Sequence, residues 1–440
     1  MYKQRTSQRR ILRGIMNTRA DVIKILDKFF SQHKPLDIEC EKPETSRLTN
    51  GVLKNLTYLD YLLEQTIEKD IKSIQKSLIN ILRCAIFEIV FDKTPEYAIV
   101  NSYVEISKKV SQKSSGFVNA VLKKFLKNKD KISLPEKEIN PLKYLSIKYS
   151  HPMWMIQRWI NFYGYEKTEE ICAYNNKNSG LNIRVNTLKI TVSDFKKLLE
   201  QNNIEYEQNP YLEVCFKIRH HGHIPDILGY KEGYFTVQGV ASCLPAKVLA
   251  PEMRSKVLDV CAAPGGKSLH LSSIMANTGA ITAVDLTEKK LEKIKENISR
   301  LGATNITTLC ADATSYEFAH LYDYILVDAP CSNTGILSKK ADIRWTRKEK
   351  DIKSISKIQY EILNNSAQYL SPNGYLVYST CSIEPEENLE VTNKFLYNNP
   401  DFELCPFTLD EKNNGFVQIL PSYLDMEGFF IAKFRKKNTQ

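Results

Sequence analysis

Apolar residues recur every three or four positions through the first 130 residues of the chain. This spacing gathers them on one helix face, so it predicts amphipathic helices rather than strands. We expect these helices over residues 18–32, 51–70, 73–91 and 114–129. Residues 127–142 are charged and polar with two prolines, which is typical of a linker. The pattern therefore predicts an all-α bundle followed by a linker.

The pattern is mixed between residues 143 and 235. Helical spacing and strand-like alternation predict, in chain order, helices over 151–164 and 166–176, a strand over 181–190, a helix over 191–203 and two short strands within 204–218. Thr191 and Ser193 are both candidate N-caps of the last helix. We expect a small α+β unit, which could be an RRM-like RNA platform, although the aromatic signature of that module is missing.

From residue 236 onward, short apolar runs alternate with helical segments. The runs are expected to form strands over 256–262, 280–286, 305–312, 322–330, 374–381 and 428–434. The helices between them are expected over 267–276, 288–302, 346–370 and 385–397. Strands that alternate with helices predict a mostly parallel, doubly wound sheet. The fold class is therefore a multidomain α plus α/β arrangement.

Composition and charge narrow the class of protein. The 440-residue chain is 42% hydrophobic and 25% charged, and no apolar run approaches the ~20 residues of a membrane span. Ten scattered cysteines without a C-x-x-C suggest reduced thiols and a cytoplasmic protein. Residues 1–130 hold 24 Lys and Arg against 15 Asp and Glu, a balance of +9, whereas the whole chain carries +10. Either the N-terminal part binds a polyanion or it is an ordinary, mildly basic domain; charge alone does not decide.

A glycine turn and three aspartates suggest a cofactor site. The stretch "LDVCAAPGGKS" (258–268) runs from a strand through Gly265 and Gly266 into a helix, where unpaired N–H groups can face a ligand. It matches neither the dinucleotide fingerprint nor the P-loop. Asp285, Asp312 and Asp328 each follow a later strand, and strand ends of such sheets meet at one crevice. One such acid could be a turn residue, but the ordered series favours a nucleoside cofactor.

Two cysteines follow neighbouring strands at the same edge. Cys331 lies in "VDAPCSNTG" and Cys381 in "YSTCSIEPEEN". They could be buried apolar thiols, a zinc pair or a disulfide, yet no flanking ligands complete a zinc site and a stable disulfide does not suit a reduced compartment. We expect both thiols to face the crevice and to take part in catalysis. The residues do not say which thiol attacks.

These motifs, with "VDLTEKKLEKIKENISRLG" and "CADAT", resemble in family order those of the RNA cytosine-C5 methyltransferases of the Sun/Nop2 family. The resemblance implies a class I (Rossmann-like) methyltransferase sheet with S-adenosyl-L-methionine as cofactor. It assigns to the cofactor site Cys261, Ala262, Ala263, Pro264, Gly265, Gly266, Lys267, Asp285, Asp312 and Asp328.

The same resemblance divides the catalytic work. It implies that Cys381 is the nucleophile that adds to C6 of the cytosine, and that Cys331 assists product release. Asp328 would orient the base and share a proton with N3. The chain departs from the family at Asn333, where glycine is common, and at Ala341, where proline is common.

The N-terminal part also has a resemblance. "LRCAIFEIVF", "TPEYAIVNSYVEISKK" and "GFVNAVLKKF" resemble the NusB-like helical RNA-binding domain, which precedes the methyltransferase in the bacterial RsmB branch acting on 16S ribosomal RNA. We therefore expect a NusB-like domain over 1–130, a connector over 143–235 and the catalytic domain over 236–440. Lys123, Lys124, Lys127 and Lys129 crowd the end of the last N-terminal helix, either as phosphate contacts or as a solvated face.

The leading hypothesis is a cytoplasmic, monomeric 16S ribosomal RNA cytosine-C5 methyltransferase with no membrane partner. Its nearest rival is the same chemistry on transfer RNA, and a rival of another class is a non-catalytic ribosome-assembly or antitermination factor. No metal is expected: Cys215, His220, His221 and His223 are close in sequence but match no common zinc spacing, and a polar loop near RNA fits them better. Tyr378 and Trp345 could stack on a base or belong to the core.

Overall fold

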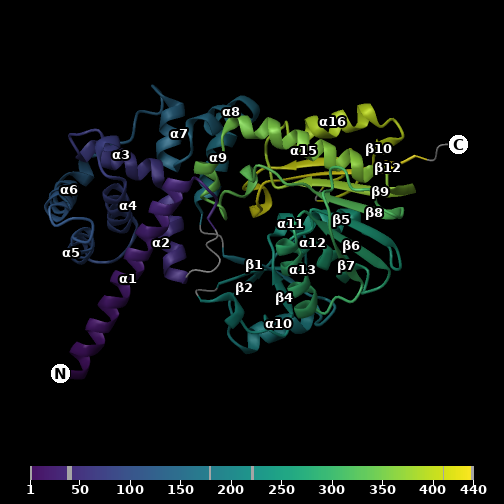
Figure 1. Cartoon of the computed structure of the whole chain (residues 1–440), viewed down its shortest axis with the longest axis horizontal. Coiled ribbons are helices and arrows are strands. Elements are labelled where there is room, and N and C mark those ends of the chain that lie inside the picture. Colours follow the sequence, from purple (N-terminus) through teal and green to yellow (C-terminus); the bar gives the residue numbers. More distant parts are fainter. Residues whose placement is uncertain (1, 37–41, 178–179, 220–221, 410, 438–440) are drawn as a thin grey trace. The chain divides into compact units, whose positions relative to one another are not determined.

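The computed structural model describes residues 2–36, 42–177, 180–219, 222–409 and 411–437. The chain divides into two compact units. The first holds the chain up to Asn176 together with Ala341–Thr346, and the second holds Lys177–Lys340 and Arg347–Gln440. Figure 1 labels most of the helices and strands of both units.

The first unit is helical. Its α-helices are α1 (Tyr2–Gln32), α2 (Pro43–Lys54), α3 (Leu56–Thr66), α4 (Lys76–Phe91), α5 (Glu96–Ser107), α6 (Ser114–Asn128), α7 (Pro141–Tyr149), α8 (Met153–Tyr163), α9 (Tyr165–Asn176) and the short α14 (Ile343–Thr346). Helix α4 lies at the centre of this unit, because it contacts α1, α2, α3, α5 and α6. Its apolar side chains Ile81, Leu82 and Ile86 are fully buried in the core. The predicted all-α bundle is confirmed.

Two local predictions in this unit were wrong. The single helix expected over 51–70 breaks at Asn55, whose side chain donates to the carbonyl oxygen of Gly51 (2.9 Å) and competes with the helical ladder. The expected linker at 127–142 is shorter, since α6 runs to Asn128 and α7 begins at Pro141. The side chain of Asn140 caps α7 by accepting from the N–H of Lys143 (2.9 Å).

A segment from late in the sequence completes the helical unit. The guanidinium of Arg344 is fully buried and donates to the carbonyl oxygens of Lys54, Tyr149, Ser150 and Asn175, which lie at the ends of α2, α7 and α9. Burial lowers the pKa of Arg344 to about 9, while the negative ends of three helix dipoles favour a cation there. Trp345 packs against this core and donates to Leu53, so packing accounts for it.

The second unit contains a small antiparallel sheet of order β2-β3-β1-β4. Its strands are β2 (Tyr206–Gln208), β3 (Cys215–Ile218), β1 (Leu181–Val185) and β4 (Phe235–Val237). Helix α10 (Val192–Gln201) packs on it through Phe195, and Thr191, one of the two predicted caps, accepts from the N–H of Asp194 (3.1 Å). The strand expected over 181–190 ends at Val185, since Asn186 turns the chain.

The large sheet has the order β10-β12-β9-β8-β5-β6-β7, with β11 on β12. Its strands are β5 (Lys256–Val260), β6 (Ala280–Asp285), β7 (Ile306–Cys310), β8 (Tyr322–Asp328), β9 (Leu370–Thr380), β10 (Phe402–Leu404), β11 (Phe416–Ile419) and β12 (Phe429–Lys436). Strands β5 to β9 are parallel and the last three pair antiparallel. The predicted doubly wound sheet is confirmed.

Helices cover both faces of this sheet (Figure 1). Helices α11 (Val240–Leu249), α12 (Gly266–Ile274) and α13 (Glu288–Leu301) lie on one face, and α15 (Glu349–Ala367) and α16 (Leu389–Asn398) lie on the other. Because β5 to β9 are parallel, their carboxyl ends meet at one edge of the sheet, where open α/β sheets bind their ligands.

Candidate active site

The glycine turn lies between β5 and α12, as predicted. Gly265 has φ 99°, in the left-handed region that favours glycine, and its N–H donates to Ala262 (2.7 Å). A Cβ atom on Gly265 would lie 3.2 Å from a side-chain carbon of Ile294, so packing also restricts this position. Helix α12 begins at Gly266, and its first N–H groups therefore lie beside the turn.

Asp285 ties this turn to the next strand. It is buried at the end of β6 and accepts from the N–H of Ala263 (3.0 Å), the N–H of Leu286 (2.7 Å) and Nζ of Lys290 (2.9 Å). A carboxylate can accept about four hydrogen bonds, so one further donor can be accommodated. The position suits a ligand hydroxyl next to the glycine turn.

Asp312 lies further from its strand than the sequence suggested. Strand β7 ends at Cys310, and the exposed Asp312 closes the following turn by accepting from the N–H (3.0 Å) and hydroxyl (2.7 Å) of Thr314. These hydrogen bonds from Thr314 lower the pKa of Asp312 below its usual value. The carboxylate is therefore also a turn residue, the alternative that the sequence had left open.

Lys267 contacts a catalytic candidate rather than the turn. Its Nζ lies 2.6 Å from Oδ2 of Asp328 and 3.2 Å from the hydroxyl of Ser242. The hydroxyl of Ser379 donates to the other oxygen of Asp328 (2.8 Å). Burial lowers the pKa of Lys267, but the charges of Asp328 and Cys381 outweigh it and the pKa is raised. Lys267 and Asp328 thus form a charged pair at the ends of α12 and β8.

The two cysteines lie side by side. Strands β8 and β9 are parallel neighbours with Asp328 paired to Ser379, so the loops that follow them are adjacent. The sulfur atoms of Cys331 and Cys381 are 3.0 Å apart, and both are free thiols. Cys331 is buried, whereas Cys381 is partly exposed. The hydrogen bond to Cys381, together with burial, raises the pKa of Cys331 well above its usual value.

A buried carboxylate joins the two cysteine loops, and the sequence reasoning missed it. Glu387 is fully buried and accepts from the N–H of Ser332 (2.8 Å), the hydroxyl of Ser382 (2.7 Å) and the side chain of Gln359 on α15 (2.9 Å). The residue lies in the quoted "EPEEN" stretch, but only the fold shows that its side chain points inward. Tyr378 is also fully buried, and its hydroxyl donates a hydrogen bond to the carbonyl oxygen of Glu387. Tyr378 therefore belongs to the core.

No metal site is found in the described part of the chain. Among these residues, no three His, Cys, Asp or Glu side chains are close enough to hold a metal ion. Of the predicted cluster, Cys215 is buried in β3 and His223 is exposed, while His220 and His221 lie outside the described residues.

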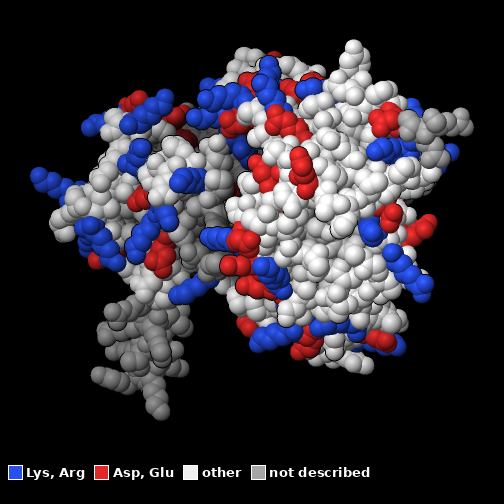
Figure 2. All heavy atoms as spheres, turned by 45° about the vertical axis from the view of Figure 1, so that its right-hand side comes forward, with Lys and Arg blue, Asp and Glu red and all other residues white. Residues whose placement is uncertain are grey.

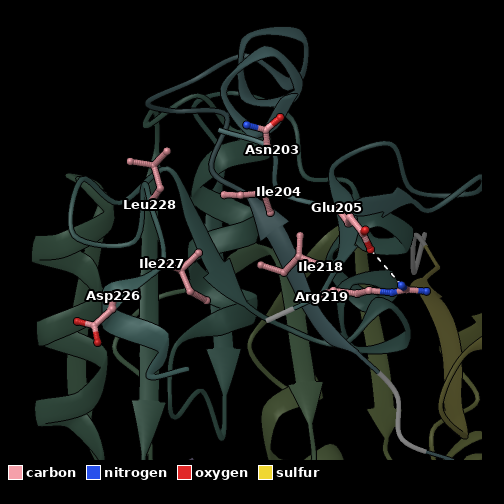
Figure 3. A pocket seen from close by; sticks show the side chains of 8 residues that line it. All are labelled: Asn203, Ile204, Glu205, Ile218, Arg219, Asp226, Ile227 and Leu228. Carbon is pink, nitrogen blue, oxygen red and sulfur yellow. Dashed lines mark hydrogen bonds and ion pairs between the residues drawn. The ribbon is translucent and has the colours of Figure 1, made fainter. Parts of the chain in front are cut away.

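Figure 3 shows a hollow on the small-sheet part of the second unit, where Ile204, Ile218 and Ile227 point toward one another. Glu205 and Arg219 form an ion pair at its side (3.0 Å). None of the predicted site residues lines it. It therefore has no part in the site described here.

The basic residues of the helical unit are partly neutralised. Of the four lysines at the end of α6, Lys124 pairs with Glu68 (2.8 Å) and Lys129 with Glu96 (2.5 Å). Lys123 and Lys127, one helical turn apart, are exposed. Acidic side chains are interspersed with the basic ones over the visible face in Figure 2. No described helix is both long and apolar enough to cross a membrane.

Three family models match successive parts of the chain. They are described as the NusB family (residues 3–127), the ferredoxin-like domain of RsmF/B-like methyltransferases (151–224) and the 16S rRNA methyltransferase RsmB/F (246–435). A probable ribosomal RNA small subunit methyltransferase B of Bacillus subtilis is 34% identical over 410 residues, which cover 89% of this chain and 90% of the relative. The chain belongs to the RsmB/F methyltransferase family.

A second relative and two solved structures are also similar to this chain over most of their length. The ribosomal RNA small subunit methyltransferase B of Pasteurella multocida is 30% identical and covers 96% of each chain. The crystal structure of PH0851 has a TM-score of 0.78 at 28% identity over 89% of each chain. A methyltransferase homologue from Pyrococcus horikoshii has a TM-score of 0.59 at 31% identity, covering 66% of this chain and 97% of its own. As an RsmB/F protein, the chain is an S-adenosylmethionine-dependent methyltransferase with a NusB domain.

Proposed function

We propose that the chain methylates C5 of a specific cytidine in 16S ribosomal RNA through a covalent bond between Cys381 and C6. The observation that carries the proposal is the pair of free thiols 3.0 Å apart beside Asp328 and Lys267. A family model described as a 16S rRNA methyltransferase and relatives named small-subunit methyltransferases support the choice of RNA. The substrate is RNA with its target base in a loop or flipped out, because C6 is inaccessible within a helix.

The cofactor fits the residues at the sheet edge. The turn from Cys261 to Lys267 offers the N–H groups of a helix N-terminus, and Gly265 adopts the left-handed conformation that this turn requires. Asp285 at the end of β6 and Asp312 in the turn after the neighbouring β7 supply acceptors. S-adenosylmethionine, when bound, supplies an electrophilic methyl group on a positively charged sulfur. Carboxylates along this edge suit a cationic nucleoside.

A nucleophile is required because C5 of an intact cytosine is too electron-poor to attack the methyl group. When the Cys381 thiolate adds to C6, an S–C6 bond forms and the electrons of the C5–C6 double bond become available at C5. C5 then attacks the methyl group, the bond between that methyl group and the sulfonium sulfur breaks, and a neutral thioether is left. A base next removes the C5 proton. The electrons of the broken C5–H bond restore the C5–C6 double bond, and the S–C6 bond breaks to release the Cys381 thiolate.

Burial and charge favour Cys381 as the attacking thiol. Cys381 is partly exposed and can reach a base, whereas Cys331 is buried and its raised pKa keeps it protonated. The ammonium group of Lys267 interacts favourably with a negative charge on Cys381. Cys331 is then placed to exchange a proton with the thiolate during product release.

Asp328 is held in place for a role at the base ring. Lys267 and Ser379 each donate to one of its oxygens, so the carboxylate cannot rotate freely. In the proposal Asp328 orients the cytosine and shares a proton with N3 while negative charge builds on the ring.

The proposal also covers the whole protein. It includes a monomeric state, a cytoplasmic location and domain boundaries at 1–130, 143–235 and 236–440.

The test uses bisulfite sequencing of ribosomal and transfer RNA from cells that lack this protein. We expect one C5-methylcytosine to disappear from 16S ribosomal RNA and to return with the native gene. Loss of a transfer RNA site instead would support the rival substrate. Survival of every C5-methylcytosine would reject the enzyme assignment and favour a non-catalytic factor.

The cysteine roles are tested with purified variants. Cys381→Ala should abolish both methylation and the covalent RNA adduct, since no thiolate remains to attack C6. Cys331→Ala should let the adduct accumulate as a slower band on a denaturing gel. Adduct formation by Cys381→Ala but not by Cys331→Ala would reverse the two roles.

A further inference from the structure

The side chain of Asn333 spans the two cysteines. Its Nδ2 donates to the carbonyl oxygen of Cys331 (3.0 Å), and its Oδ1 accepts from the thiol of Cys381 at an S–O distance of 3.1 Å. Asn333 takes no part in the proposed methyl transfer. It nevertheless contacts the sulfur atom that is proposed to attack the base.

The backbone at this position restricts the residue to very few types. Asn333 has φ 63° and ψ 22°, which is left-handed helical conformation. Glycine adopts it without strain, and asparagine and aspartate tolerate it better than other side chains do. Glycine, common here in the Sun/Nop2 family, would satisfy the backbone but would provide no group near Cys381. Asparagine satisfies the backbone and adds an amide.

The orientation of that amide is fixed by its second hydrogen bond. If the amide turned over, Oδ1 would face the carbonyl oxygen of Cys331 and two acceptors would repel each other. Oδ1 is therefore held toward Cys381. A carbonyl oxygen stabilises a thiol that donates to it and destabilises a thiolate, because the thiolate has no proton to share.

We propose that Asn333 stabilises the neutral thiol of Cys381 against its thiolate and so restrains the nucleophile of the resting enzyme. The inference rests on the proposed function, in which Cys381 is the attacking group. Asn333 opposes Lys267, whose ammonium group on α12 favours the thiolate. The other ionisable groups here are Cys331, Asp328 on β8, which pairs with Lys267, and Glu387, which lies near Cys331.

The experiment measures alkylation of Cys381 by iodoacetamide in the full-length protein between pH 6 and pH 9. Peptide mass mapping assigns the label, and the exposed Cys310 serves as an internal reference. Asn333→Gly removes the acceptor and should increase the alkylation rate about fivefold at the acidic end of this range, the value of one hydrogen bond. Asn333→Asp keeps the shape and adds a negative charge that repels a thiolate, so it should slow alkylation over the same range.

The opposite signs separate this role from a merely structural one. Both variants lose the donor to Cys331, so a loop that is only loosened would make Cys381 more reactive in both. Equal directions for the two variants, or rates unchanged relative to Cys310, would overturn the proposal. The methylation assay of Cys381→Ala decides the proposed function separately, because it does not depend on Asn333.

Discussion

At the residue scale, the unusual groups of the catalytic unit are polar side chains buried with incomplete partners. Asp259 on β5 is fully buried. The hydroxyl of Ser268 donates to one of its oxygens, and the other has no hydrogen-bond partner among the described residues. Burial, with the charges of Asp328 and Asp285, raises the pKa of Asp259 from 3.8 to about 7. Asp259 therefore supports the cofactor turn most strongly as a protonated acid.

This leads to a pH dependence of stability. Because the folded state holds the Asp259 proton more tightly than the unfolded state, its contribution is complete below pH 3.8 and is lost as the pH rises to about 7. The slope cannot exceed about 1.4 kcal/mol per pH unit. Asp259→Asn should therefore flatten the fall in the free energy of unfolding over this range, measured by urea denaturation.

Asp323→Asn is the matched control, because it removes the charge of an exposed aspartate on β8 and keeps an oxygen that can accept from the N–H of Lys256. An equal slope for the native chain and Asp259→Asn would show that folding does not raise the pKa of Asp259.

At the element scale, the site depends on the hydrogen bonds that link the loop after β8 to the loop after β9. The loops after β8 and β9 carry the two cysteines, and Glu387 connects both to α15 through Ser332, Ser382 and Gln359. A short 3.0 Å approach of two thiols requires their loops to be held in register. Glu387 is thus a positioning residue for the pair.

Glu387→Ala should lower the free energy of unfolding by roughly 3 kcal/mol or more, because three buried donors lose their acceptor. We expect methylation to fall at least tenfold in assays run well below the unfolding midpoint, since a small displacement of catalytic groups is costly. Glu387→Gln retains one acceptor oxygen and should recover part of both. Glu390→Ala, at an exposed position on α16, is the control; a folded Glu387→Ala enzyme with native activity would contradict the positioning role.

At the scale of the whole molecule, a nearly neutral catalytic part is joined to a basic helical part. The chain carries +10, of which +9 falls in residues 1–130. RNA binding should therefore weaken as salt increases, in proportion to the phosphates that Lys and Arg contact. The exposed Lys123 and Lys127 on α6 are available for such contacts, while Lys124 and Lys129 already pair with acids.

The double change Lys123→Gln and Lys127→Gln should reduce the slope of log affinity against log salt by about 1.5, the value for two lost phosphate contacts. Fluorescence anisotropy with a 16S ribosomal RNA fragment measures the slope. The double change at Lys124 and Lys129 is the control and should have a smaller effect. An unaltered slope in the first variant would mean that this end of α6 is a solvated face.

The periodicity of the sequence was enough to predict the helical bundle, the α+β segment and the parallel sheet, because amphipathic spacing is a local property. It also predicted that Asp328, Cys331 and Cys381 would meet, since adjacent parallel strands bring their carboxyl ends together. The glycine turn was recognisable because its backbone requirement is met by consecutive residues. The break at Asn55 was missed because a single side-chain hydrogen bond ends the helix there.

The tertiary structure decided which side chain meets which. Lys267 is 61 residues from Asp328, and Glu387 is 55 residues from Ser332, so their contacts depend on strand register and on loops that are distant in sequence. The same holds for Asn333 against Cys381, and for Arg344 against three helix ends that precede it in the chain by more than 160 residues. Sequence alone determined the type and order of most elements and the chemical groups at the sheet edge. Packing determined the partners that set their charge and orientation, because those partners are neighbours only in the folded chain.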